Sequence, residues 1–249
     1  MPKTSNPEDS SSGRRNATKE ALLSAAERLY AEHGVDAVSM REITREAGQK
    51  NSSAFQYHFS SKEALISAII VRRMKDGDSR RLEFLHDLET RGRLAEVRSL
   101  AAAMVEPLAV GIRSPKRWPG ERVWIRFLSQ VQRRSEFDLV ELSKVASDLG
   151  LRRVYTLLGK QLRHVPEVVM RQRFLICMSQ VVHGLAEIDR QRERRGRSRQ
   201  RFDVERAIEN LIDMTAGALS APVSIEITRA GQDLELTNRR QRSIKNVRG

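Results

Sequence analysis

The sequence predicts an all-α protein. Apolar residues recur at helical spacing along most of the chain. The first clear run consists of Leu22, Ala25, Ala26, Leu29 and Tyr30. Proline is rare, with seven residues in 249, and several prolines fall where a helix could end or kink. Polar and apolar residues alternate only in a short stretch at 223–228, so no β-sheet is expected.

The composition is that of a globular chain without a membrane segment. Apolar residues make up 39% of the sequence, which is enough to form a substantial core. No run approaches the roughly 20 apolar residues that a membrane helix needs, and residues 1–15 lack the apolar segment of a secretory signal. Cys177 is the single cysteine, so no internal disulfide can form. We therefore expect a cytoplasmic protein that does not contact membranes.

The net charge of +13 favours a polyanionic partner such as nucleic acid. The charge does not locate the binding surface, because residues 14–63 are nearly neutral and much of the excess lies in the Arg-rich stretch 190–201.

Turn and capping signals divide the first third of the chain into helices. The predicted helices cover 18–33, 39–47 and 52–58, and a longer one follows from about 62. Gly34 and Gly48 end the first two. Ser39 to Glu42 and Ser60 to Glu63 have the pattern of capping boxes that open the second and fourth. Two short helices joined by a turn with Gly48 are the layout of a helix-turn-helix, whose second helix enters the major groove of DNA.

Two segments within residues 21–66 resemble the N-terminal domain of the TetR family of transcriptional regulators. They read ALLSAAERLYAEHGVDAVSMREITREAG and SAFQYHFSSKEALI. The stretch from Gly48 to Phe59 is one residue longer than the common family spacing, and we place the extra residue at 49–51. The resemblance implies a homodimeric repressor that leaves a palindromic operator in double-stranded DNA when a small molecule binds. An activator or a ligand-independent regulator on the same fold is the alternative.

The pattern of apolar and polar residues predicts how the rest of the chain is organised. Further helices are predicted at 93–111, 120–134, 138–162, 167–189 and 202–219. The expected parts are a disordered N-terminal arm at 1–15, a helix-turn-helix DNA-binding domain at 16–66, a helical ligand-binding and dimerisation domain at 67–220 and a basic disordered tail at 221–249.

The third helix is expected to read DNA bases. Phe55 and Phe59 are four residues apart and should face the core, so Ser52, Ser53 and Gln56 would face the groove. A glutamine can pair with adenine through two hydrogen bonds, and serine is a less selective partner. Gln56 also fits a capping box with Ser53, so a purely structural role is the alternative.

Contacts with the DNA backbone are expected from residues at the end of that helix and just after it. By resemblance, Tyr57 and His58 contact phosphates or sugars, although Tyr57 could pack on the fourth helix and His58 could be half-buried. Lys62 in the first turn of the fourth helix opposes the helix dipole, and a nearby phosphate would reverse that balance.

Residues at the starts of the first two helices are further candidates. Ser39 and Arg41 could touch the other side of the groove, and Ser39 could also act only as an N-cap. Arg14 and Arg15 could reach the minor groove or form part of a free tail.

The C-terminal half should supply the dimer interface and the ligand pocket. By resemblance, the interface lies on 167–189 and 202–219; the alternative is that both helices belong to the core. Pocket candidates are Trp124, Phe127, Leu128 and Arg126, and Arg126 could meet an anionic ligand or simply face solvent. No spacing of histidines, cysteines and acids suggests a metal site. With no nucleophile–base set or cofactor loop either, we expect neither a cofactor nor an enzyme.

Overall fold

The computed structural model confirms the all-α class. It describes residues 7–49, 53–117, 119–134, 137, 145–146, 148–196 and 202–224, and this part of the chain contains no strand. The helices are α1 (Pro7–His33), α2 (Met40–Glu46), α3 (Ser53–His58), α4 (Lys62–Thr90), α5 (Val97–Arg113), α6 (Pro119–Val131), α8 (Leu149–Gln161), α9 (Glu167–Gly196) and α10 (Val204–Ser220). None of the described helices is long and apolar enough to cross a membrane.

The N-terminal helices begin and end close to the signals in the sequence. Gly34 follows α1 with φ +85°, a backbone conformation that favours glycine. Ser39 caps α2 and forms the expected reciprocal box with Glu42. The box predicted at Ser60 is wrong by one residue, because Ser61 caps α4 by accepting a hydrogen bond from the backbone N–H of Ala64.

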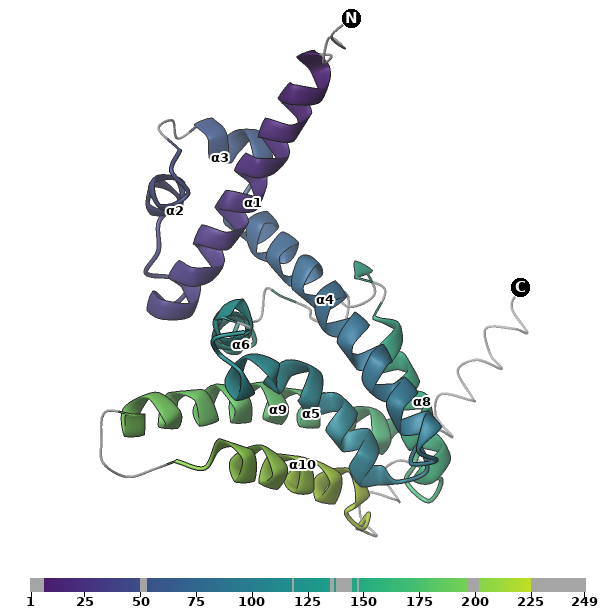
Figure 1. Ribbon diagram of the computed structural model, residues 1–249. Coiled ribbons are helices and arrows are strands. Elements are labelled where there is room, and N and C mark those ends of the chain that lie inside the picture. The colour runs from purple at the N-terminus through teal and green to yellow at the C-terminus, as the bar shows by residue number, and fades with distance from the viewer. Residues whose placement is uncertain are drawn as a thin grey trace, which may run out of the picture.

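Helix α1 is longer than predicted. It begins at Pro7 instead of near Thr18, so residues 7–15, which we expected to be disordered, are helical. Proline suits a first helical position because its missing N–H would have no partner within the helix. The added turns project beyond the rest of the N-terminal domain (Figure 1).

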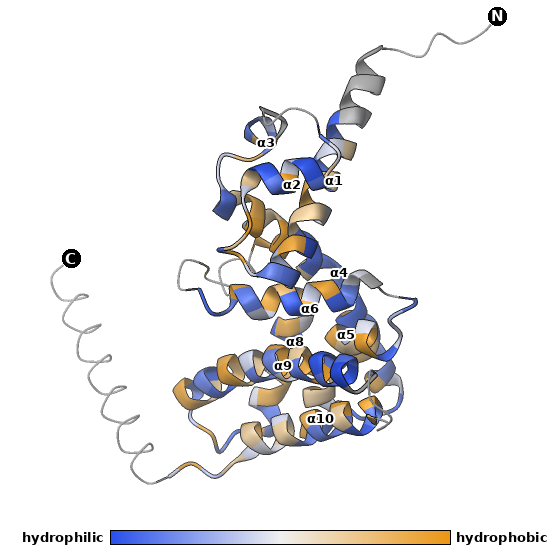
Figure 2. Cartoon of the chain, turned by 90° about the vertical axis from the view of Figure 1, so that its left-hand side faces the viewer, coloured by the Kyte–Doolittle hydropathy of each residue, from blue (hydrophilic) through white to orange (hydrophobic). Residues whose placement is uncertain are grey.

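The body consists of α5 to α10 and the second half of α4. Helix α4 runs from the N-terminal domain into the body, where it packs against α5 and α8 (Figure 1). Helix α6 packs against α1, α5 and α9, and α10 packs against α5 and α9. Each of these helices carries both polar and apolar residues (Figure 2), as is typical of amphipathic helices around one core.

Two predicted boundaries in the body change. The helix expected at 138–162 is observed as α8 from Leu149, and residues 138–144 lie outside the described part. The start of the tail, at 221–224, is docked. The Arg173 guanidinium donates hydrogen bonds to the carbonyl oxygens of Leu219, Ala221 and Pro222, and Val223 packs against the core.

Candidate nucleic-acid interface

Helix α3 is anchored by two aromatic side chains on one face. Phe55 and Phe59 are buried, as predicted, and their ring centroids are 5.8 Å apart. Helices α1 and α2 pack against α3. This fixes α3 on the N-terminal domain and leaves its opposite face toward solvent.

The free face of α3 carries several of the expected DNA-contacting side chains. Gln56 is exposed, Tyr57 is 67% exposed and His58 is half-buried. The rings of Tyr57 and His58 meet edge to face at 5.0 Å. The exposure of Tyr57 excludes the alternative that it packs against α4.

The N-terminal extension of α1 reaches this surface. The Arg15 guanidinium donates a hydrogen bond to the Tyr57 hydroxyl over 3.4 Å. The sequence predicts Arg15 on a flexible arm or a free tail and does not reveal this contact. The sequence does contain a signal for the longer helix. Pro7 is a favourable first helical residue, and no other proline lies between it and the end of α1.

Two predicted contacts at the start of α3 remain predictions. Ser52 lies outside the described residues, and Ser53 begins α3 but its side chain is not described. The alternative that Gln56 caps the helix together with Ser53 therefore stays open.

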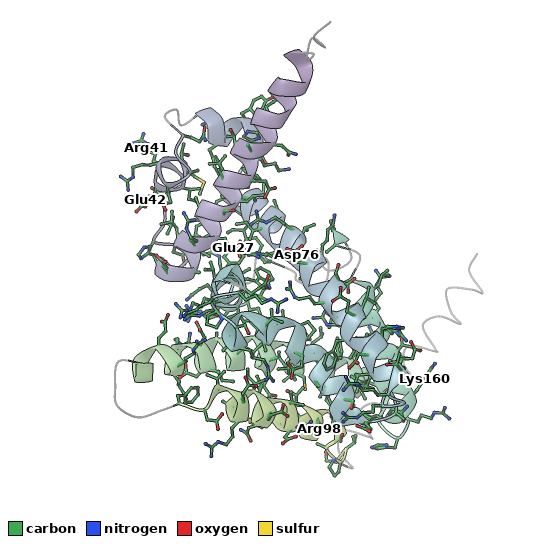
Figure 3. All side chains as sticks on the ribbon, in the orientation of Figure 1. Glu27, Arg41, Glu42, Asp76, Arg98 and Lys160 are labelled. Carbon is green, nitrogen blue, oxygen red and sulfur yellow. The ribbon has the colours of Figure 1, made fainter. Side chains whose placement is uncertain are left out.

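The two candidates at the start of α2 differ in their contacts within the protein. The Ser39 hydroxyl accepts a hydrogen bond from the Glu42 N–H, and the Glu42 carboxylate accepts one from the Ser39 N–H, each over 3.2 Å. Hydrogen bonds from Ser39 lower the pKa of Glu42. Arg41 is exposed and points away from α1 (Figure 3). Arg41 is thus the α2 side chain better placed for an outside partner.

Lys62 is turned toward its own domain. Its ammonium donates hydrogen bonds to the backbone carbonyls of Val35 and Val38, the latter over 3.0 Å, and lies 5.4 Å from the centre of the Tyr30 ring. Burial lowers its pKa. Two of its three protons are thus used to hold the loop between α1 and α2. The expected phosphate contact would depend on the third proton or require these bonds to break.

The pocket candidates on α6 belong to an aromatic cluster in the core. Trp124, Phe127 and Leu128 are all buried. The Phe127 ring lies 6.1 Å from Tyr30 of α1 and 5.8 Å from Trp124, so the cluster joins the two domains. Three hollows lined by described residues lie elsewhere, beside the α1–α2 loop, beside the start of α6 and between α9 and α10.

Arg126 does not simply face solvent, and its contact with an anionic ligand remains a prediction. It pairs with Asp189, which is fully buried, and with Glu193, both on α9. Arg122 makes ion pairs with the same two acids, each over 2.7 Å. Arg126 therefore joins α6 to α9, and the sequence could not show this because its partners are more than 60 residues away.

Helices α9 and α10 divide their apolar residues between two faces. Cys177, Val181, Val182 and Leu185 of α9 are buried within the protomer. Ile176 of α9 is 66% exposed and Met214 of α10 is 53% exposed. A groove of about 430 Å³ runs between the two helices. The core alternative holds for one face of α9, and the other face remains open to a partner.

The chain is similar to known regulators over most of its length. Residues 22–69 match the family of bacterial regulatory proteins of the tetR type, and residues 102–218 match the C-terminal domain of tetracycline-repressor-like proteins. A comparison with curated proteins finds no match.

Solved structures share the fold at low sequence identity. A protein of Shewanella sp. PV-4 assigned to the TetR family is 16% identical, with a TM-score of 0.55 over 81% of this chain and 97% of that one. The regulator FadR of Bacillus subtilis, solved with stearoyl-CoA, is 15% identical, with a TM-score of 0.51 over 82% of this chain and 99% of that one. The N-terminal family domain contains the exposed helix-turn-helix, and the C-terminal family domain follows it in the chain. The chain therefore belongs to the TetR family of bacterial transcriptional regulators.

Proposed function

We propose that this regulator is a dimeric repressor in the cytoplasm that binds a palindromic operator through α3 and leaves it when a small molecule binds. The observation that carries DNA reading is the division of α3 into two faces. Phe55 and Phe59 anchor one face, while Gln56 and Tyr57 are exposed on the other. A helix held in this way can present polar side chains to base edges.

The exposed apolar side chains of α9 and α10 support the dimer. Leu175, Ile176 and Met214 are large, apolar and exposed within one protomer. A second copy that packs there would bury them in a four-helix interface, and two-fold symmetry would match a palindromic operator.

For the small-molecule effector, the supporting observation is two buried polar atoms in the aromatic cluster between α1 and α6, where a ligand would have to open the packed core. The Trp124 indole nitrogen and the Tyr30 hydroxyl are buried there, with no hydrogen-bond partner in the described part of the chain. Buried polar atoms are usually satisfied, so these two are candidates for a ligand or a bound water. An effector that favours another arrangement of α6 would shift the recognition helices and lower operator affinity. An activator or ligand-independent regulator remains the second candidate.

Selection of binding sites from randomised DNA tests the proposal. The full chain should enrich an inverted repeat. Gln56→Ala should relax the preference at one base position and cost roughly 1–3 kcal/mol per half-site, because a base contact is lost. Lys160→Ala is the control, since Lys160 is exposed on α8 far from α3 (Figure 3).

Three results would contradict parts of this proposal. Absence of an enriched sequence with the folded wild type would overturn specific DNA binding. An unaltered base preference for Gln56→Ala together with a lower melting temperature would assign Gln56 to capping. Enrichment of single half-sites alone would overturn the palindromic operator.

A further inference from the structure

A chain of charged side chains crosses from the DNA-binding domain to α6 through a single arginine of α4. Arg73 donates from Nε to Glu27 of α1 over 2.8 Å. Its Nη1 pairs with Glu121 of α6 over 3.3 Å, and its Nη2 donates to the Gly120 carbonyl over 3.2 Å. Each nitrogen of the guanidinium is thus directed at a different acceptor on one of two other helices. The surroundings of Glu27 are visible between α1, α4 and α6 in Figure 3.

Both carboxylates that pair with Arg73 are deeply buried. Glu27 is 2% exposed and Glu121 is 5% exposed. Burial raises the pKa of Glu27, and Arg73 and Arg72 oppose this rise. Buried ion pairs contribute little net stability because desolvation offsets their attraction, but loss of one partner strands the other. The planar fork of an arginine also fixes the directions of its partners.

Glu121, the partner of Arg73 on α6, is held rigidly. A Cβ atom on Gly111 of α5 would lie 2.5 Å from the Glu121 Cβ, so α5 and α6 meet here at the closest distance the backbones allow. Arg80 also pairs with Glu121 over 2.9 Å and donates to the Pro107 carbonyl over 3.1 Å. Glu121 is therefore fixed to the body, and Arg73 transfers its position to Glu27.

A second charged contact lies at the other end of α6. Arg134, just beyond that helix, pairs with Asp36 in the loop between α1 and α2. Between these two ends, α1 packs on α6 through the stacked rings of Tyr30 and Phe127. Together with this packing, the two charged contacts at opposite ends of α6 fix the direction of α1, and with it the direction of α3.

We infer that Arg73 is a positioning residue for DNA binding, which fixes the orientation of each DNA-binding domain on the body and so sets the half-site spacing that the dimer accepts. This inference rests on the proposed binding of a dimer to two half-sites. The two recognition helices of a dimer must match successive major grooves, so a small tilt changes the preferred spacing. Without Arg73 the domains should tolerate more spacings while each still recognises its half-site.

The test compares Arg73→Gln with Arg72→Gln. Arg72 is the neighbouring residue and also pairs with Glu27, over 2.9 Å, but its other partner is Glu20 of α1, over 2.7 Å. It is therefore a matched control that removes a Glu27 ion pair and leaves the link to α6 intact. Binding is measured on the selected operator, on operators with spacers changed by one or two base pairs, and on single half-sites.

We expect wild type and Arg72→Gln to prefer the selected spacing by roughly tenfold, a common size for coupling between sites. Arg73→Gln should reduce that preference to about twofold, with half-site affinity unchanged. Glu121→Gln removes the ion pair on the α6 side and keeps the bond to the Gly120 carbonyl, so it should loosen the spacing preference in the same direction, which decides the matter if Arg73→Gln fails to fold.

Three outcomes separate this inference from the proposed function. A wild-type protein without spacing preference would overturn both. Unchanged spacing preference in folded Arg73→Gln or Glu121→Gln would overturn the inference alone. Equal loosening by Arg72→Gln would also overturn it, because the link to α6 would then be irrelevant.

Discussion

At the scale of single residues, charged side chains take part in contacts within the protein that their local sequence does not reveal. Lys62 was expected to meet a phosphate, yet its ammonium binds the carbonyls of Val35 and Val38. Arg126 was expected to meet a ligand or solvent, yet it pairs with Asp189 and Glu193. Both contacts join segments of the chain that are far apart in sequence.

Lys62→Ala should therefore act first on stability. Loss of two hydrogen bonds from a charged donor should lower the free energy of unfolding by about 1.5–3 kcal/mol. The salt dependence of DNA binding should change by less than about one unit per protomer, because phosphate contact is at most a secondary role. Urea unfolding and binding at two salt concentrations measure both effects, with exposed Lys19→Ala as control. A full loss of about two units per dimer with unchanged stability would restore the phosphate assignment.

A buried aspartate, Asp148, should make the stability of the protein depend on pH. Arg81 and Asp148 are buried and paired over 3.4 Å, and Asp78 is buried beside them. Burial, opposed by Arg81 and assisted by hydrogen bonding with and repulsion from Asp78, raises the pKa of Asp148 from 3.8 to about 6. The folded state then binds this proton more tightly than the unfolded state. The contribution of Asp148 to stability is therefore greatest at acid pH and falls as the pH rises from 3.8 to about 6.

Asp148→Asn should remove this part of the pH dependence. The difference between wild type and variant in the free energy of unfolding isolates it from other carboxyl groups. Urea unfolding between about pH 4 and pH 7 measures the difference, and asparagine keeps an oxygen that can cap Leu151. A difference that stays constant over that range would contradict the raised pKa.

At the scale of elements, the end of α10 is held by one side chain from α9. Arg173 donates to three backbone carbonyls at 219–222. Carbonyls at the end of a helix lack partners within it, so a cation there satisfies them and complements the helix dipole. The first residues of the expected tail thus belong to the folded body.

Truncation at two positions tests where the body ends. A chain that stops after Ser224 should unfold at nearly the wild-type temperature, because residues 225–249 contain few apolar groups to offset the entropy of ordering. A chain that stops after Ser220 loses two Arg173 contacts and Val223, and it should be less stable by about 1–3 kcal/mol. Thermal unfolding measures both. A large loss on truncation after Ser224 would show that the tail also docks.

At the scale of the whole molecule, the proposed dimer depends on which face of α9 is free. Val181 is fully buried within the protomer, so a charge there would disrupt the fold itself. Ile176 is 66% exposed and suits the test. Ile176→Glu should place an unpaired charge in the interface and dissociate the dimer by at least about tenfold, while each protomer remains folded.

Sedimentation and circular dichroism check this expectation. Thr156→Glu is the control, because Thr156 is exposed on α8 outside the proposed interface. An unchanged dimer in Ile176→Glu would move the interface away from this face.

The sequence by itself determined the helices, most of their ends and the family. Three signals carried this prediction: the period of apolar residues, the Ser39 capping box and the glycine after α1. Each depends on contacts between residues at most four positions apart, so the interacting residues can be identified from the sequence. The anchoring of α3 by Phe55 and Phe59 also follows from spacing alone.

Only the tertiary structure decided which charges meet and which apolar faces stay open. Arg72 and Arg73 are adjacent and chemically identical, yet only Arg73 reaches α6. Ile176 and Val181 are both apolar residues of α9, yet one is exposed and the other is buried. Ion pairs and helix packing join residues far apart in sequence, and many partners of equal chemistry compete for each one. Which side chains pair depends on the directions in which the packed helices hold them. A local sequence pattern does not show these directions.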